Sequence, residues 1–131
     1  MKYSLDTNIC IAWIKGEDLS LREKIISHHP RDLSICSIVK AELLYGALKS
    51  KNRIKNEHLL SIFFSNIQSL TFNDEAAGFY ASLRISQEKM GATIGPNDLL
   101  IASIALQNQL TLVTRNENEF KQIPHLKVEV W

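Results

Sequence analysis

Short apolar segments typical of β-strands alternate with helical segments along the whole chain of 131 residues. The expected strands cover residues 2–5, 32–36, 69–72, 111–114 and 127–131. The expected helices cover residues 8–15, 18–28, 38–48, 54–66, 74–89, 96–107 and 117–122. Because strands that alternate with helices normally build a parallel sheet with helices on both faces, the order predicts an α/β fold. We expect three layers, α/β/α, around a central parallel sheet of about four to five strands.

Residues at the segment ends support these boundaries. Gly16 and Gly91 follow helical segments, where glycine commonly ends a helix, and Pro96 stands at the favoured first helical position. Ser37 is expected to cap the helix over residues 38–48. The inner face of the helix over residues 18–28 is expected to consist of Leu19, Leu21, Ile25 and Ile26.

Composition restricts the class of protein. A chain of this length with 45% hydrophobic residues fits one domain, residues 1–131, and no segment approaches the about 20 apolar residues of a membrane span. The net charge is +1, so attraction to nucleic acid would need a local basic patch or a metal. Cys10 and Cys36 lie in apolar segments, and the N-terminus does not resemble a secretory signal. We therefore expect reduced thiols and a cytoplasmic protein.

Two helices carry a carboxylate among apolar residues at helical spacing. The inward stripe of the helix after Gly95 is expected to be Asp98, Ile101, Ala102 and Ala105. The stripe of the helix after Ser37 is expected to be Ile38, Val39, Glu42, Tyr45 and Gly46. Burying an unpaired carboxylate is unfavourable, and neither stripe contains lysine or arginine. A bound cation would neutralise both acids.

Polar residues follow two of the expected strands. Asp6 ends the first strand, and the strand over residues 111–114 runs into Arg115-Asn116-Glu117-Asn118-Glu119. The carboxyl ends of parallel strands share one edge of a sheet, where active sites collect. That edge would gather Asp6, Glu42, Asp98, Asn116 and Glu119. Oxygen ligands of this kind suit Mg²⁺ or Mn²⁺, which activate water and neutralise charge on a phosphodiester.

Each of these residues also has a structural explanation. Asp6 could simply cap the first helix, and Asp98 could be an acid that favours a helix start. Glu42 could be paired in the core, and Glu117 and Glu119 could be solvated. The cluster Lys49, Lys51, Arg53 and Lys55 is either a polar turn or a contact for RNA phosphates. Taken together, the acids favour a site.

Several segments together resemble the PIN-domain family and, more narrowly, VapC toxins of bacterial type II toxin–antitoxin systems. They are residues 5–11 (LDTNICI), 41–46 (AELLYG), 94–102 (IGPNDLLIA), 112–120 (LVTRNENEF) and 126–131 (LKVEVW). The resemblance covers essentially the whole chain, with the segments in order and at the expected spacing. It implies a PIN domain and an endoribonuclease that depends on Mg²⁺ or Mn²⁺.

The resemblance also assigns residues. Asp6, Glu42 and Asp98 match the three metal-binding acids of the family. Asn116 stands where many PIN domains have a fourth acid, so it would orient water while Glu119 supplies a carboxylate. The site would hold either one metal ion or two. Thr7, Asn8 and Thr114 would support the site. Apart from the resemblance, Lys49, Lys51, Arg53 and Arg115 are candidates for contacts with RNA because they are basic.

The implied biology is a toxin that cleaves RNA and so inhibits translation until a VapB antitoxin neutralises it. The expected substrate is tRNA, initiator tRNA in particular, and operator DNA would be bound only through the antitoxin. A homodimer within a larger complex is expected. One alternative is a catalytically weak PIN-fold module for protein interaction or regulation, supported by Asn116. Another is a phosphatase or phosphotransfer domain, which would need a second acid beside Asp6 where Thr7 and Asn8 stand.

Overall fold

The structure is a computed structural model that describes residues 1–91 and 94–131. Its strands are β1 (Tyr3–Leu5), β2 (Leu33–Cys36), β3 (Gln68–Leu70), β4 (Thr111–Val113) and β5 (Val128–Glu129). Its α-helices are α1 (Thr7–Lys15), α2 (Leu19–Ile26), α3 (Ser37–Leu48), α4 (Arg53–Ser65), α5 (Asp74–Met90), α6 (Pro96–Gln107) and α7 (Glu117–Phe120). The predicted elements are all present, with ends that differ by up to two residues at most boundaries.

The strands form one five-stranded sheet in the order β3-β2-β1-β4-β5, and every neighbouring pair is parallel. The predicted parallel α/β sheet is therefore confirmed. From β1 the chain adds β2 and then β3 on one side, and it returns to the other side of β1 for β4. The strand order reverses between β1 and β4, where Leu5 lies opposite Val113. In open α/β sheets such a reversal is the usual place for a binding site.

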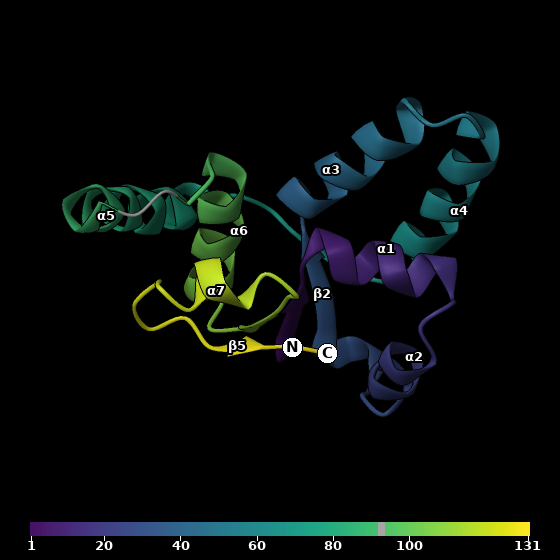
Figure 1. The fold of residues 1–131 in the computed structure, drawn as a ribbon, viewed down its shortest axis with the longest axis horizontal. Coiled ribbons are helices and arrows are strands. Elements are labelled where there is room, and N and C mark those ends of the chain that lie inside the picture. Colours follow the sequence, from purple (N-terminus) through teal and green to yellow (C-terminus); the bar gives the residue numbers. More distant parts are fainter. Residues whose placement is uncertain (92–93) are drawn as a thin grey trace.

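The helices cover both faces of the sheet. Helices α1, α2 and α4 lie on one side, and α5, α6 and α7 lie on the other (Figure 1). Helix α3 starts at the carboxyl end of β2, and with α4 it forms a hairpin that extends beyond the sheet (Figure 1). We call this hairpin, residues 37–65, the α3–α4 arm.

The core is formed by the strands and by α6. Leu5, Ile35 and Leu112 in the central strands are fully buried, and so are Ile101 and Ile104 of α6. Strands that are covered on both faces are usually apolar throughout, and β1, β2 and β4 are mostly so, with Ser4 and Ser34 as buried polar exceptions. The sheet is thus a rigid base from which the carboxyl-end residues project.

Two expectations from composition can be compared with the structure. Cys10 and Cys36 are both buried and form no disulfide, as expected. Burial raises the pKa of both thiols, which makes neither of them a reactive thiolate. Among the described residues, no helix combines the length and the apolar character needed to cross a bilayer.

Two expected helix faces are wrong. In α2, Leu21 and Ile25 are buried, whereas Leu19 and Ile26 are each 67% exposed. In α3 the buried residues are Val39, Leu43 and Ala47, rather than the expected stripe through Glu42 and Tyr45. Because α3 is apolar nearly all round, its sequence does not select one face, and its packing against α1, α4 and α6 makes the choice.

Candidate active site

Asp6 lies at the carboxyl end of β1, directly before α1. Its Oδ1 accepts a hydrogen bond from the Thr7 backbone N–H at 2.8 Å, which caps α1, and its Oδ2 accepts one from the Thr114 hydroxyl at 2.7 Å. The side chain is buried, and only 6% of the residue is exposed. Asp6 is therefore a helix cap and also a fixed carboxylate at the point where the strand order reverses.

The end of β4 continues this hydrogen-bonded chain. Thr114 is fully buried, and its hydroxyl also accepts a hydrogen bond from the Asn116 backbone N–H at 3.0 Å. The side-chain amide of Asn116 donates to Glu119 Oε2 at 3.0 Å. Asn116 thus orients Glu119 at the place where the resemblance puts a fourth acid.

Glu42 and Asp98 complete a group of acids at this edge. Burial raises the pKa of Asp98 to about 7, helped by a hydrogen bond with Glu119 and by the negative charges of Asp6, Glu119 and Glu42. Burial also raises the pKa of Glu42, and the charge of Asp6 adds to this shift. Within the described residues, none of these four acids has an ion pair with a basic side chain. The neighbouring carboxylates thus oppose the ionisation of Asp98 and Glu42, as expected for an uncompensated cluster.

The chemistry of these donors fits a hard divalent cation, although the side chains stand apart. Across residues 1–91 and 94–131, no three acidic, histidine or cysteine side chains are placed to hold an ion together. The Thr7 hydroxyl is buried and makes no full hydrogen bond, but it is close enough to Glu42 to lower the pKa of that carboxyl slightly. Clustered carboxylates without a cationic partner are the ligands that Mg²⁺ and Mn²⁺ prefer. Binding would require the side chains to close around the ion.

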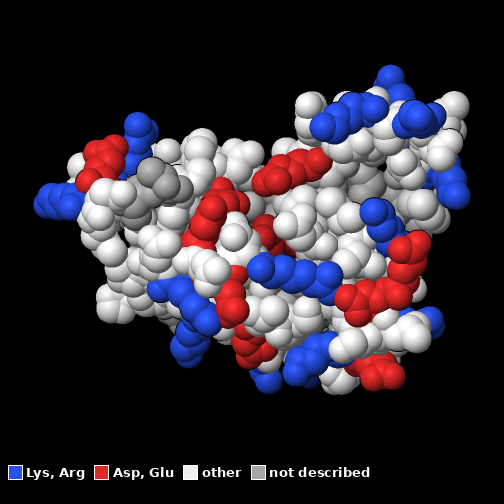
Figure 2. Space-filling model, in the orientation of Figure 1, with Lys and Arg blue, Asp and Glu red and all other residues white. Residues whose placement is uncertain are grey.

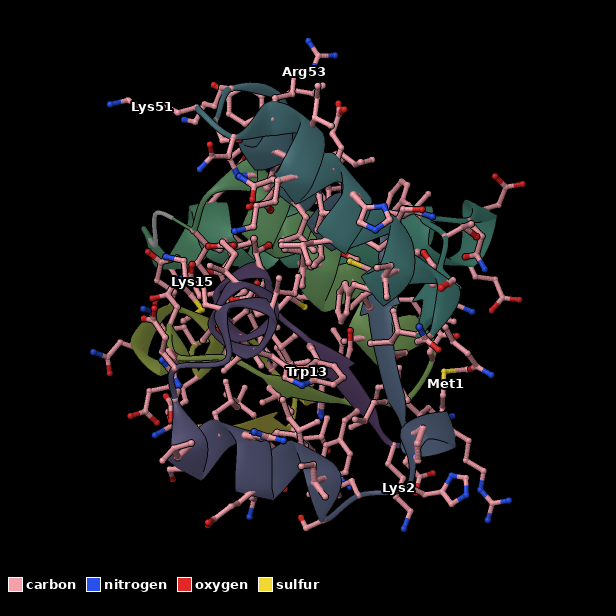
Figure 3. The ribbon with its side chains drawn as sticks, turned by 90° about the vertical axis from the view of Figure 1, so that its right-hand side faces the viewer. Met1, Lys2, Trp13, Lys15, Lys51 and Arg53 are labelled. Atoms are coloured by element: carbon pink, nitrogen blue, oxygen red, sulfur yellow. The ribbon has the colours of Figure 1, made fainter. Side chains whose placement is uncertain are left out.

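The remaining predicted residues lie around this acidic cluster. Acidic side chains follow the notch between the α5–α6 side and the α3–α4 arm (Figure 2). Lysine and arginine gather at the outer end of the arm, and Lys51 and Arg53 point away from it (Figures 2 and 3). Asn8 is exposed in the first turn of α1 and makes no side-chain hydrogen bond within the described chain. Its supporting role stays a prediction.

Arg115 is placed differently from the other basic residues. Its guanidinium pairs with Asp18, the residue that caps α2, and its Nε donates to the Trp131 backbone oxygen at 3.4 Å. The sequence does not reveal this pair, because the two residues are 97 positions apart. Arg115 therefore ties the loop after β4 to α2 and to the C-terminal residue. Its predicted contact with RNA is untested.

We expect the metal-free protein to lose stability as the pH rises from about 4 to about 7. The pKa of Asp98 moves from 3.8 to about 7 on folding, so in this window the folded state keeps a proton that the unfolded state has lost. The folded state then binds more protons, and the free energy of unfolding falls with increasing pH. Urea midpoints measured in EDTA at several pH values would show this slope. Equal slopes for the wild type and Asp98→Asn would contradict it.

Comparisons with known proteins identify the family of this chain. A family model described as the PIN domain matches residues 3–126. Ribonuclease VapC2 of Rickettsia felis is 43% identical over 100% of this chain and 98% of its own length. The chain belongs to the PIN-domain family, in its VapC group.

Other VapC proteins show the same relation. The tRNA(fMet)-specific endonuclease VapC of Shigella flexneri is 35% identical over 100% of this chain and 98% of its own length. A crystal structure of VapBC2 from Rickettsia felis, bound to a DNA fragment from the promoter, contains a chain with 41% identity and a TM-score of 0.92. That match covers 100% of this PIN domain and 99% of the other chain. The predicted PIN fold is therefore confirmed, while the roles of single residues stay predictions.

Proposed function

We propose that this PIN-domain protein is the toxin of a type II toxin–antitoxin pair, and that it hydrolyses RNA phosphodiesters as a metal-dependent endoribonuclease. The observation that carries the proposal is the acidic cluster of Asp6, Glu42, Asp98 and Glu119, which has no basic partner among the described residues. Similarity to proteins named ribonuclease and tRNA(fMet)-specific endonuclease supports RNA as the substrate class.

Asp6, Glu42 and Asp98 are the residues that would hold Mg²⁺ or Mn²⁺, with Glu119 as a fourth acid. A bound divalent ion would activate water and neutralise charge on the phosphodiester. The protein's own groups prepare the site. Thr114 orients Asp6, and Asn116 orients Glu119. Because its pKa is raised to about 7, Asp98 is partly protonated at neutral pH, and this proton would leave when a cation binds, because ligands must be deprotonated.

The proposed substrate is tRNA, and the Shigella flexneri relative makes initiator tRNA the first one to test. Cleavage of initiator tRNA would inhibit translation. We propose a VapB-type antitoxin as the partner, since similar chains were crystallised as VapBC complexes. Operator DNA would be bound through that antitoxin, in a complex that contains a toxin homodimer.

The alternative function is a PIN-fold module without catalysis. The support for this alternative is Asn116, which stands where many PIN domains have a fourth acid. However, the Asn116 amide donates to the Glu119 carboxylate at 3.0 Å, and Glu119 helps to raise the pKa of Asp98. The site thus keeps four acids, and burial disfavours the charged forms of two of them, Glu42 and Asp98, which favours a bound cation and catalysis.

The test uses purified protein freed of any antitoxin and incubated with total tRNA. Three reactions are compared, namely wild type with Mg²⁺, wild type with EDTA, and Asp98→Asn with Mg²⁺. We expect cleavage only in the first. Cleavage that survives EDTA or the substitution would exclude the mechanism. Folded wild-type protein that cuts no RNA with either Mg²⁺ or Mn²⁺ would favour the binding module.

A further inference from the structure

We propose that the exposed face of α3 binds unpaired nucleotides of the RNA next to the acidic cluster, with Tyr45 stacking on a base and Lys49 binding a phosphate. This inference rests on the proposed function and assigns a path to its substrate. We call the strip formed by Glu42, Tyr45 and Lys49 the α3 strip.

Helical spacing aligns these three residues. Positions i, i+3 and i+7 lie on one side of a helix, so Tyr45 on α3 and Lys49, the residue that caps its C-terminus, follow Glu42 toward the tip of the arm. At 1.5 Å per residue, Lys49 is about 10 Å along the axis from Glu42. The α3 strip therefore leads directly away from the acidic cluster over a length that a few nucleotides cover.

Tyr45 has the features of a stacking platform. It is 63% exposed, although tyrosine is a large amphipathic residue that usually packs against its neighbours. The ammonium of Lys49 lies 4.8 Å from the centroid of its ring. A ring has two faces, so a base can use the one that Lys49 leaves open. Stacking on an aromatic ring is a common way to bind single-stranded nucleic acid without sequence preference.

Charge favours RNA on this face. The acidic cluster repels phosphates, and the net charge of +1 supplies no general attraction. The tip of the arm, from the end of α3 into the first turn of α4, carries Lys49, Lys51, Arg53 and Lys55. Among the described residues, only Arg53 of these four has an acidic partner, Glu57 at 3.2 Å. The tip is therefore a local positive surface at the far end of the α3 strip.

The substrate form follows from the stacking. A base paired in a duplex does not present its face to a side chain, whereas bases in loops and single strands do. We therefore expect the α3 strip to favour single-stranded over duplex RNA. The competing occupant is a protein, because Leu44 and Leu48 of the same helix are 40% and 49% exposed. The experiment below separates the two.

The experiment measures binding of a fluorescent single-stranded RNA, and of its duplex, to antitoxin-free protein in EDTA. We expect Tyr45→Ala to weaken single-strand binding about tenfold and Tyr45→Phe to retain it, with little change for the duplex. We expect Lys49→Gln to reduce the slope of log K against log salt by about 0.7, a change that Tyr45→Ala would not produce. Phe79→Ala and Lys89→Gln on α5 are the matched controls. Phe79 is 42% exposed, and neither residue lies on the arm.

The inference is overturned if Tyr45→Ala binds like Phe79→Ala, if it weakens duplex and single strand equally, or if the wild type binds no single strand. A change in oligomer mass with unchanged RNA affinity would assign the face to a protein and also overturn it. Melting curves identify variants that do not fold. If Tyr45→Ala binds weakly, single-strand binding by a folded Tyr45→Phe protein distinguishes loss of the aromatic ring from loss of the fold. Cleavage in Mg²⁺ separates the two proposals. Wild-type cleavage with an unaltered KM in Tyr45→Ala would reject the α3 strip alone, whereas absent wild-type cleavage would reject the proposed function.

Discussion

Asp98→Asn removes metal-dependent RNA cleavage and yet raises the melting temperature of the metal-free protein. Losing one carboxylate ligand forfeits several kcal/mol of charge stabilisation in the transition state, so we expect the rate to fall about 100- to 1000-fold. Stability changes in the opposite direction. Burial, Glu119, Asp6 and Glu42 all oppose the charge on Asp98, and asparagine removes that charge at nearly constant shape.

At a pH above the Asp98 pKa of about 7, where this carboxyl is charged, we expect the melting temperature in EDTA to increase by a few degrees. About 1 kcal/mol shifts a domain of this size by roughly 3–6 °C. Asp74→Asn is the matched control, because Asp74 is an exposed acid in the first turn of α5. It should leave cleavage unchanged and should not increase stability, since it only loses a favourable interaction with the helix dipole. A clear decrease in the melting temperature of Asp98→Asn would show that Asp98 acts mainly as a helix-start acid.

Thr114→Val is expected to damage both stability and activity. The Thr114 hydroxyl donates to Asp6 Oδ2 at 2.7 Å and accepts from the Asn116 N–H at 3.0 Å, and the residue is fully buried. Valine has nearly the same shape, so the loss comes from the two groups that are left without a partner. We expect the free energy of unfolding to fall by about 1–3 kcal/mol. Cleavage should fall about 10- to 100-fold, as when a group that orients a metal ligand is removed.

Thr111→Val at the start of the same strand is the control. Its side chain is partly buried and makes no hydrogen bond within the described chain, so both measurements should stay close to wild type. Thr114→Ser keeps the hydroxyl and should recover most of the cleavage rate. Urea unfolding in EDTA and initial rates in Mg²⁺ provide the measurements. Wild-type activity in a folded Thr114→Val protein would mean that Asp6 needs no orienting partner.

Much of the fold could be predicted because the responsible interactions are local. Strand segments such as residues 111–114 and helices such as α6 have their own composition, caps and breakers. The stripe of Asp98 was also recoverable, since Ile101, Ala102 and Ala105 are all fully buried. Helix α6 is enclosed on most sides, since every residue from 101 to 105 is buried, so the expected stripe did not depend on which face turns inward.

The less predictable parts depend on contacts between distant segments. In α3 the inward face could not be read from the sequence, and Tyr45 turned out to be exposed rather than part of the core. The pair of Arg115 with Asp18 has no local signal. The orientation of Glu119 by Asn116 was likewise visible only once the hydrogen bond between their side chains was seen.

The sequence by itself determined the strand-and-helix order, the parallel sheet and the presence of carboxylates at its carboxyl edge. Periodicity and polarity encode these features, because each depends on which neighbours along the chain are apolar. The tertiary structure alone decided which acids influence one another and which face of α3 is free. Those properties arise from burial and from charges that come close only in the folded chain. Asp6 has an interaction of each kind: it accepts a local hydrogen bond from the N–H of the next residue, Thr7, and a long-range one from Thr114, 108 positions away.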